Sequence, residues 1–345
     1  MIHKMKTKYT KQVNFPFKNI IYVIILFTTS IQNTIAQNEV KTRGSKNAIN
    51  NLKIVGKGTI SSTDFEFNQT RNKEDNIAYF TKALLPDWRR MSIVVSTKDK
   101  NGNWSTPKLA KFSGKYRDAD PFISPDQRRL IFISDRPSQH KSKSAHYGFW
   151  FINLPLTNNS IPYPVINEFN KEIQNPVYPS LSKDNTLFFS SGTRSGSNIY
   201  YSNFDGRKYG SAVSLNFNND NYFDLDPVIA PDKSFIIFVS NNRNGKGGKD
   251  LFVSFNNNGI WSKPKNLGDK INTRANEGQP GLSSDGKTLF FSSLRVEKAA
   301  NYKPRDKKID NNQLLEELKS IHNGLPNIWQ ADISNIQLLN NNKSH

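Results

Sequence analysis

The chain has 345 residues, of which 35% are hydrophobic and 12% aromatic, so it is long and apolar enough to bury a sizeable core. Cysteine is absent, which excludes disulfide scaffolds, cysteine-ligated zinc, iron–sulfur clusters and thiol catalysis. The formal net charge of +19 favours contact with polyanions but does not name one.

Residues 1–36 have the pattern of a secretory signal peptide. They contain several lysines and no acid, an apolar run covers residues 20–27, and Ala36 precedes a polar residue. The apolar run is shorter than a membrane-spanning helix. We therefore expect an exported protein, which is periplasmic, outer-membrane associated or secreted, with no transmembrane span in the mature chain. An uncleaved N-terminal anchor is the alternative.

One sequence pattern recurs after this leader. In each of four copies a proline stands five residues before an aspartate; the copies are residues 120–126, 178–184, 226–232 and 279–285. An apolar run follows each aspartate, at residues 130–134, 187–190, 235–240 and 289–292. Because proline presets φ and aspartate accepts turn geometry, each copy predicts two strands joined by a tight turn.

Further strands complete the repeating unit. A third strand is expected at residues 148–151, 198–201, 250–253 and 327–330. Residues 104–109 and 261–267 share a Trp-Ser-x-Pro pattern that ends the unit, with a looser copy at 209–215, and residues 64–109 form a degenerate first copy. Five units with four short strands each predict an all-β protein, a β-propeller with five blades; six blades is the alternative.

The propeller is expected to cover residues 61–340, with a tail at 341–345. The N-terminal segment 37–60 contains a strand-like stretch that we expect to pair into the last blade and close the ring. Residues 295–324 insert between the second and third strands of that blade. Within this insertion Asp310 and Gln313 predict the start of a short helix that ends at Gly324.

The turn Asp120-Pro121-Phe122-Ile123-Ser124-Pro125-Asp126 and its Phe-x-Ser strand resemble the PD40 repeat, a WD40-like repeat of the TolB-like propeller family. The best copies are residues 118–136, 224–243 and 277–295, and the Trp261–Leu267 pattern resembles PD40 proteins of Bacteroidetes envelopes. We find neither an OmpA-like segment nor a TolB-like N-terminal α/β domain. The resemblance implies a cell-envelope location and binding to a protein or glycan, not a reaction.

Acidic residues recur at the start of the first strands: Glu66, Asp118, Asp120, Asp224, Asp226 and Glu277. The first strand of a propeller blade is innermost, so these carboxylates are expected around one mouth of the central channel. We favour a structural role for them, because they follow the repeat. If the protein is an enzyme, Asp120, Asp226 and Glu277 are the candidate catalytic acids of a glycoside hydrolase.

Arginines recur after the second strands, at Arg136, Arg194, Arg243 and Arg295. They are predicted to pair with the repeated acids, since guanidinium and carboxylate groups form bidentate ion pairs. Binding of an anionic ligand is the alternative. The candidate binding residues are therefore these four arginines with Asp118, Asp120, Asp224, Asp226 and Glu277.

The remaining patterns are less specific. The insertion contains six basic residues, which we interpret as a solvated loop; an anionic polysaccharide, lipid headgroup or acidic partner is the alternative. These residues are Arg295, Lys298, Lys303, Arg305, Lys307 and Lys308. Asn218, Asn219 and Asp220 with Asp224 and Asp226 are oxygen-rich, but a turn is favoured over calcium binding. We predict no metal and no cofactor.

The sequence thus favours a non-enzymatic binding scaffold of the cell envelope, a monomer or a subunit of an envelope complex. Its partner would be a protein or a glycan such as peptidoglycan, met by the loops at 136–147, 192–197, 241–249 and 295–308 and by the channel mouth. Nucleic acid is not expected, because the protein is predicted to be exported. A carbohydrate-active enzyme that uses the channel-mouth carboxylates is the alternative.

Overall fold

The computed structural model describes residues 47–84, 88–138, 147–170, 173, 175–193, 196–215, 217, 223–241, 243–295 and 308–341. A compact unit begins at Ala48. The predicted signal peptide lies outside the described residues, as do Arg194, Asn218, Asn219, Asp220 and four basic residues of the insertion (Lys298, Lys303, Arg305 and Lys307). Within the described ranges, no helix has the length and apolar character needed to cross a membrane.

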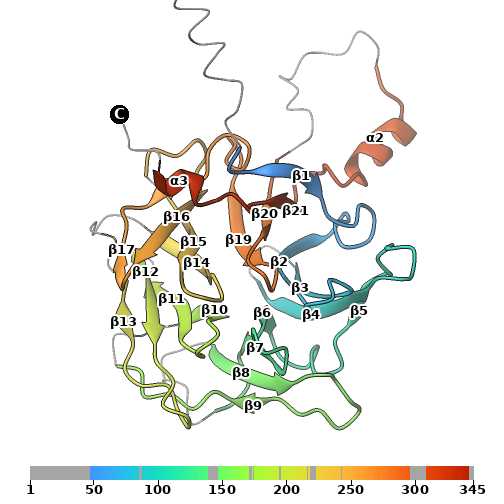
Figure 1. The fold of residues 1–345 in the computed structure, drawn as a ribbon. Helices are drawn as coiled ribbons and strands as arrows, with labels where there is room; N and C mark the ends of the chain where they lie inside the picture. Colours follow the sequence, from blue (N-terminus) through green and yellow to red (C-terminus); the bar gives the residue numbers. More distant parts are fainter. Residues whose placement is uncertain are drawn as a thin grey trace, which may run out of the picture. The chain divides into compact units, whose positions relative to one another are not determined.

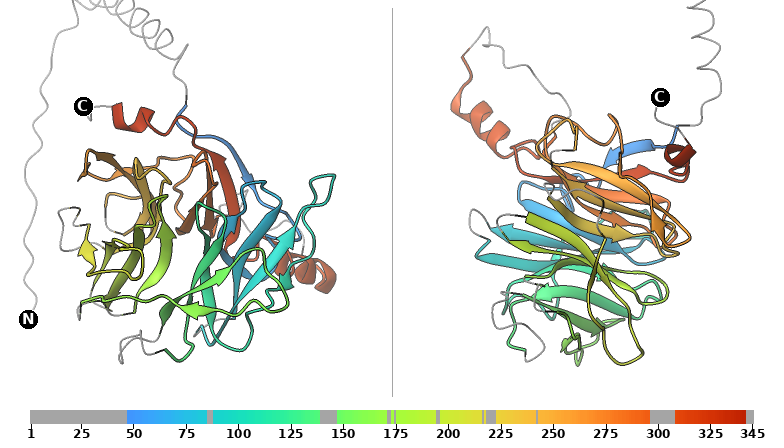
Figure 2. Two further views of the ribbon diagram at one scale, coloured as in Figure 1. Left: turned by 60° about the horizontal axis from the view of Figure 1, so that its bottom comes forward. Right: turned by 90° about the vertical axis from the view of Figure 1, so that its left-hand side faces the viewer.

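The strands of this unit form five antiparallel sheets, the blades of a propeller (Figures 1 and 2). Blade one contains β2 (Phe65–Arg71), β3 (Ile77–Leu84), β4 (Arg90–Thr97) and β5 (Lys108–Leu109). Blade two contains β6 (Asp118–Ile123), β7 (Arg129–Ser134), β8 (Gly148–Asn153) and β9 (Tyr163–Pro164). Blade three contains β10 (Val177–Leu181), β11 (Leu187–Thr193), β12 (Gly196–Ser202) and β13 (Val213–Ser214).

Blade four contains β14 (Asp224–Ile229), β15 (Phe235–Ser240), β16 (Asp250–Asn257), β17 (Ile260–Trp261) and β18 (Lys265–Asn266). Blade five contains β19 (Glu277–Leu282), β20 (Thr288–Ser293), β21 (Asn327–Asp332) and β1 (Asn50–Ile54). The inner strands β2, β6, β10, β14 and β19 contact one another in a closed ring. The predicted all-β propeller with five blades is confirmed, and the six-bladed alternative is excluded.

The ring closes through the N-terminal strand, as predicted. β1 pairs antiparallel with β21, with Asn50 opposite Asp332 and Ile54 opposite Trp329. At the inner side of the same junction, blade five meets blade one at Gly281. A Cβ atom there would lie 2.4 Å from the carbonyl oxygen of Gln69, so only glycine allows the two inner strands to approach this closely.

Each repeated turn is stabilised by its own aspartate. The Ser124 hydroxyl donates to Asp126 at 2.5 Å, Ser182 donates to Asp184 at 2.5 Å, and Ser283 donates to Asp285 at 2.6 Å. The turns of blades two to five each contain a residue with positive φ: Gln127, Asn185, Lys233 and Gly286. The Ser-x-Asp pattern therefore satisfies local polar groups and leads the chain directly into the second strand.

The core lies between neighbouring blades rather than at one centre. Every residue of β15 is buried, and one cluster joins Val239 and Leu251 of blade four to Phe291 and Trp329 of blade five. Burial on both faces of the second strands, such as β7, β15 and β20, explains why their sequences are almost continuously hydrophobic.

The insertion in blade five contains the helix α2 (Asn311–Leu318). Asp310 caps it and Gln313 completes the capping box, as predicted. The helix is shorter than expected, because it ends at Lys319 and Gly324 lies in a later turn with φ of 89°. Its leucines Leu314, Leu315 and Leu318 are exposed. A second short helix, α3 (Leu338–Asn341), was not predicted from the sequence.

Candidate functional site

The same irregularity occurs in all five inner strands and points one side chain per blade toward the channel. The pairing of each inner strand with its neighbour shifts register at this point. The residue at the shift has positive φ in every blade: Asn68, Asp120, Tyr178, Asp226 and Gln279. We call these five residues the channel ring. Such a bulge locally re-aims a side chain.

Two residues earlier on four of these strands lie the repeated acids Glu66, Asp118, Asp224 and Glu277, which we call the blade acids. All four are buried and each pairs with a cation of its own blade. Arg243 donates to both carboxylate oxygens of Asp224, at 2.6 and 3.2 Å. Arg136 is bidentate on Asp118 in the same way.

Blades five and one vary this pairing. Arg295 Nη2 lies 3.4 Å from Glu277 Oε1, and its guanidinium also donates to the carbonyl oxygen of Ile271. In blade one the cation is Lys82, whose Nζ lies 3.2 Å from Glu66 Oε1. The predicted pairing of acids with arginines is thus present at Arg136, Arg243 and Arg295, while Arg194 lies outside the described residues.

Burial and ion pairing act in opposite directions on the blade acids. Burial raises the pKa of Asp118 and outweighs the Arg136 charge and the hydroxyls of Ser134 and Ser113, which favour the anion. Burial likewise raises the pKa of Glu66 despite its bonds to Ser62 and Lys82. These groups are desolvated and held in fixed pairs, an arrangement suited to bracing a blade rather than to contacting a ligand.

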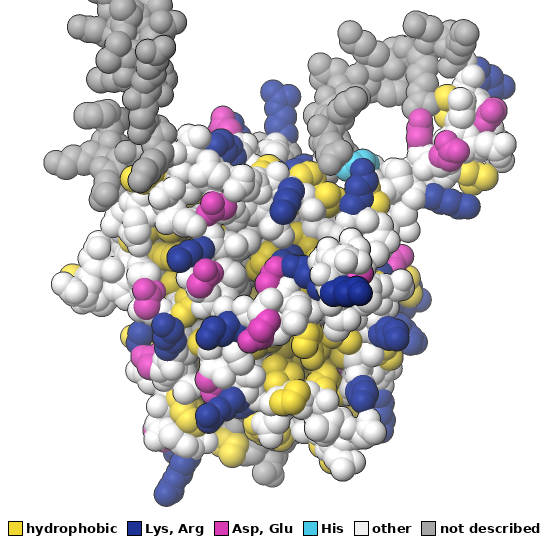
Figure 3. Space-filling model, turned by 45° about the vertical axis from the view of Figure 1, so that its right-hand side comes forward, with side chains coloured by type: hydrophobic (Ala, Val, Ile, Leu, Met, Phe, Trp, Pro, Cys, Tyr) yellow, Lys and Arg dark blue, Asp and Glu magenta, His cyan; other side chains and the backbone are white. Residues whose placement is uncertain are grey.

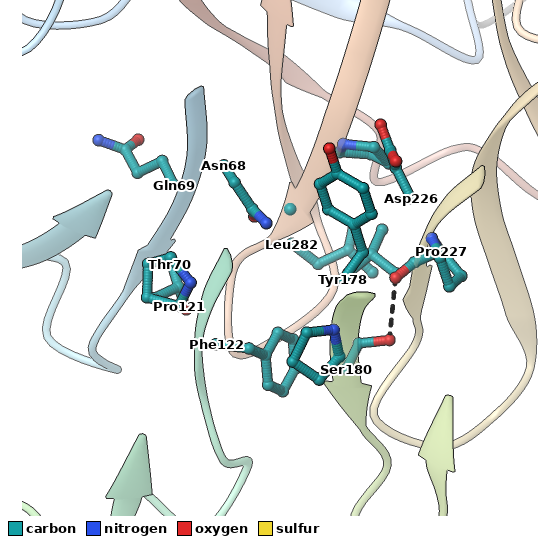
Figure 4. A pocket seen from close by; sticks show the side chains of 14 residues that line it. Asn68, Gln69, Thr70, Pro121, Phe122, Tyr178, Ser180, Asp226, Pro227 and Leu282 are labelled. Carbon is teal, nitrogen blue, oxygen red and sulfur yellow. Dashed lines mark hydrogen bonds between the residues drawn. The ribbon is translucent and has the colours of Figure 1, made fainter. Parts of the chain in front are cut away.

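The channel ring is held by different contacts from those of the blade acids. Figure 4 shows the side chains of Asn68, Tyr178 and Asp226, which line one small cavity. Asn68 Nδ2 donates to Asp120 Oδ1 at 3.1 Å, and the backbone N–H of Tyr178 donates to Asp120 Oδ2 at 3.2 Å. The backbone N–H of Gln279 donates to Asp226 Oδ2 at 3.2 Å. Within the described ranges, neither aspartate has a cation at salt-bridge distance.

Because Asp120 and Asp226 have no cation at salt-bridge distance in the described ranges, burial dominates their pKa values. Burial raises the pKa of Asp120 to about 7; the Asn68 bond opposes the shift and the charge of Asp226 adds to it. Burial raises the pKa of Asp226 to about 6, and Lys249 opposes the shift. Burial and the two aspartates raise the pKa of Tyr178 well above its usual value of 10. Of the five residues in the channel ring, Asp120 and Asp226 are therefore the two whose raised pKa values lie close to neutral pH.

The cavity beside the channel ring is small. Its lining includes Asn68, Tyr178, Asp226, Ser180 and the repeated prolines that follow the channel-ring residues. The cavity leaves about 10 Å³ for the centre of a solvent molecule. That is room for about one water. A sugar ring does not fit in this cavity as it stands.

The three predicted catalytic acids do not occupy equivalent positions in the structure. Asp120 and Asp226 belong to the channel ring, whereas Glu277 is paired with Arg295 and Gln279 occupies the channel position of its blade. Asn68, Tyr178 and Gln279 were not among the site residues predicted from the sequence. A signal for Tyr178 and Gln279 was available, since each directly precedes the repeated proline, as Asp120 and Asp226 do.

Basic side chains are dispersed on the one face of the molecule that Figure 3 draws. On the face in Figure 3, lysine and arginine side chains are scattered among acidic and hydrophobic ones and do not form one patch. Among the described residues, no group of three or more His, Cys, Asp or Glu side chains is arranged to hold a metal ion. The oxygen-rich stretch 218–220, for which the sequence favours a turn over calcium binding, lies outside those residues.

Comparison with known proteins identifies similar folds. No protein-family model matches the chain, and no curated protein does. A GH43_12 protein from a capybara gut metagenome has a TM-score of 0.47 and 11% identity, over 84% of this chain and 54% of that one. A thermostable family-43 glycoside hydrolase has a TM-score of 0.43 and 10% identity, over 67% of this chain and 83% of that one.

A Mycobacterium tuberculosis puromycin-hydrolyzing peptidase has a TM-score of 0.37 and 11% identity, over 66% of this chain. The matched part is 33% of that peptidase. At these identities the likeness concerns the fold alone. The chain is a five-bladed β-propeller with structural neighbours in several propeller families.

Proposed function

We propose that this protein is an exported, non-enzymatic binding scaffold of the cell envelope, of the PD40 or TolB-like propeller type, which displays its loops and channel mouth to a protein or glycan. The observation that carries the proposal is the pairing of every blade acid with a cation of its own blade. Carboxylates fixed in this way stiffen the ring and are not presented to a substrate. A rigid ring that holds variable loops is a suitable binding platform.

The test is a crosslinking pull-down with residues 37–345 from envelopes of the source organism, followed by mass spectrometry and sugar analysis. The loop variant K246E/K249E changes the loop between β15 and β16. The control K73E/K100E reverses two exposed lysines in the turns that follow β2 and β4. Specific, saturable retention of a protein or glycan that the loop variant weakens supports the proposal. Retention of neither would end it.

A glycoside hydrolase is the second candidate, and one observation favours it. Asp120 and Asp226 lack a cation partner among the described residues, and their pKa values of about 7 and 6 suit proton transfer. Hydrolysis of envelope polysaccharides should be assayed with wild type, D120N, D226N and E277Q. Turnover that both aspartate variants abolish, at unchanged folded fraction, would replace the scaffold proposal with an enzymatic one.

A further inference from the structure

A groove of about 530 Å³ lies between the outer parts of blades three and four and is lined by residues of both β13 and β17, which Figure 1 labels. We call it the blade 3–4 groove. Its size is that of a ligand site. Blade three contributes Phe188, Tyr201, Asn203 and Ser214, and blade four contributes Asn256 and Trp261.

The aromatic side chains form one connected surface in this groove. Phe188 is buried at the base, while Tyr201 and Trp261 are half-buried. The Phe188 ring centroid lies 5.9 Å from that of Tyr201, and it lies 6.5 Å from that of Trp261, with the rings nearly perpendicular. The buried Phe188 ring thus contacts the rings of both Tyr201 and Trp261, each of which remains partly exposed in the groove.

Polar groups with unused hydrogen-bonding capacity surround these rings. In the described part of the chain, the Tyr201 hydroxyl, the Ser214 hydroxyl and the Trp261 indole N–H make no hydrogen bond. The amides of Asn203 and Asn256 each use only the carbonyl oxygen, which accepts from Thr186 Oγ1 at 3.5 Å and from the Gly259 N–H at 2.7 Å. Both amide NH₂ groups remain available as donors.

The equivalent groove between blades one and two shows that this chemistry is not imposed by the fold. Strand pairing aligns the two grooves, because Phe188 lies opposite Tyr201 as Tyr79 lies opposite Val95. Its volume is about 480 Å³, and its lining has Val95 in place of Tyr201 and Leu109 in place of Ser214. Tyr79 and the amides of Asn72 and Gln127 also line the groove between blades one and two, but the two positions equivalent to Tyr201 and Ser214 are aliphatic there. The fold therefore does not dictate the residue type at these two positions.

We infer that the blade 3–4 groove binds hexose units of a neutral polysaccharide. The C–H face of a pyranose packs on an aromatic ring, and its hydroxyls pair with amide and hydroxyl groups, which is the combination found here. The lysine of this groove, Lys233, is already paired with Asp184, so no free positive charge in its described lining selects an anion. This inference rests on the proposed binding function and names the partner class.

The test measures binding of residues 37–345 to soluble β-glucan and mannan, two neutral hexose polymers, by affinity electrophoresis and by tryptophan fluorescence titration. Y201A and N203A/N256A are expected to weaken binding at least tenfold, and W261A more, with partial rescue by W261F. L109A in the equivalent groove serves as the matched control and is expected to bind as wild type does. Thermal melting verifies that each variant is folded.

The outcomes separate the inference from the proposed function. Polysaccharide binding that all three groove variants retain overturns the inference and leaves the scaffold in place. Capture of an envelope protein with no polysaccharide binding does the same. Retention of no partner of either class overturns both.

Discussion

Asp224 and Asp226 lie two residues apart on β14, and both are buried, at 5% and 4% exposure. Asp224 forms a bidentate pair with Arg243, whereas Asp226 accepts one backbone N–H and faces the channel. The first belongs to a position that is acidic in four blades. The second belongs to a ring that changes from Asn to Asp, Tyr, Asp and Gln around the propeller. The blade acids therefore stabilise the individual blades. The channel-ring residue differs in type from blade to blade, and these residues determine the chemistry of the channel.

The largest expected effect comes from breaking a blade pair. Arg243→Met leaves the Asp224 carboxylate buried without its cation and should lower the free energy of unfolding by roughly 3–5 kcal/mol. Urea unfolding followed by circular dichroism measures this loss. The double variant Asp224→Leu/Arg243→Met should recover part of it. A loss below about 1 kcal/mol for the single variant would mean that the pair does not brace the blade.

The next effect distinguishes the channel ring by pH. Asp120 has a pKa of about 7 in the folded chain, against about 3.9 when unfolded. Because the folded state holds the proton more tightly, this contribution to stability is complete below about pH 4 and disappears as the pH rises through about 7.

Asp120→Asn removes that dependence. Relative to wild type, the variant should gain on the order of 2–4 kcal/mol of unfolding free energy between pH 4 and pH 8. Urea unfolding across the pH series measures the difference, and Glu74→Gln, an exposed acid, provides the control. A difference between wild type and Asp120→Asn that does not change with pH would contradict the raised pKa of Asp120 in the folded chain.

A smaller effect is expected for the blade pair with a lysine. The Lys82 side chain is 26% exposed, and Glu66 also accepts bonds from Ser62. Lys82→Met should therefore cost about 1–2 kcal/mol, less than Arg243→Met, because water and Ser62 replace part of the lost contact. The same urea experiment compares the two. An equal loss of unfolding free energy in Lys82→Met and Arg243→Met would show that the exposure of the cation does not determine how much a blade pair contributes to stability.

The smallest expected effect concerns the exposed Lys249. Its charge lowers the pKa of Asp226, so Lys249→Ala should raise that pKa, by less than about 0.5 unit because the charge is solvated and screened. Carbon-detected NMR titration of the aspartate carboxyl groups measures it. A shift in the pKa of Asp226 well above one unit would show that Lys249 interacts with Asp226 as strongly as a paired cation does. The contrast between Asp226 and Asp224 would then no longer hold.

Local sequence patterns predicted the architecture well. The Ser-x-Asp turns, the apolar second strands and the recurrent Trp-Ser exits gave the five blades, and the strand-like stretch before residue 61 gave the ring closure. The capping residues Asp310 and Gln313 located the start of α2. Its end was predicted too late because its leucines pack against no core, so nothing beyond Lys319 favours a longer helix.

The sequence by itself determined the repeating unit, because turn preferences and strand alternation act over a few residues. Only the tertiary structure decided which acid of each Asp-x-Asp pair meets an arginine, since those partners are 18 or 19 residues apart in sequence. It also brought Tyr201 and Trp261 into one groove from different blades. Pairing and enclosure are long-range properties, set by strand register and by the bulge in each inner strand, and neither is encoded in a local pattern.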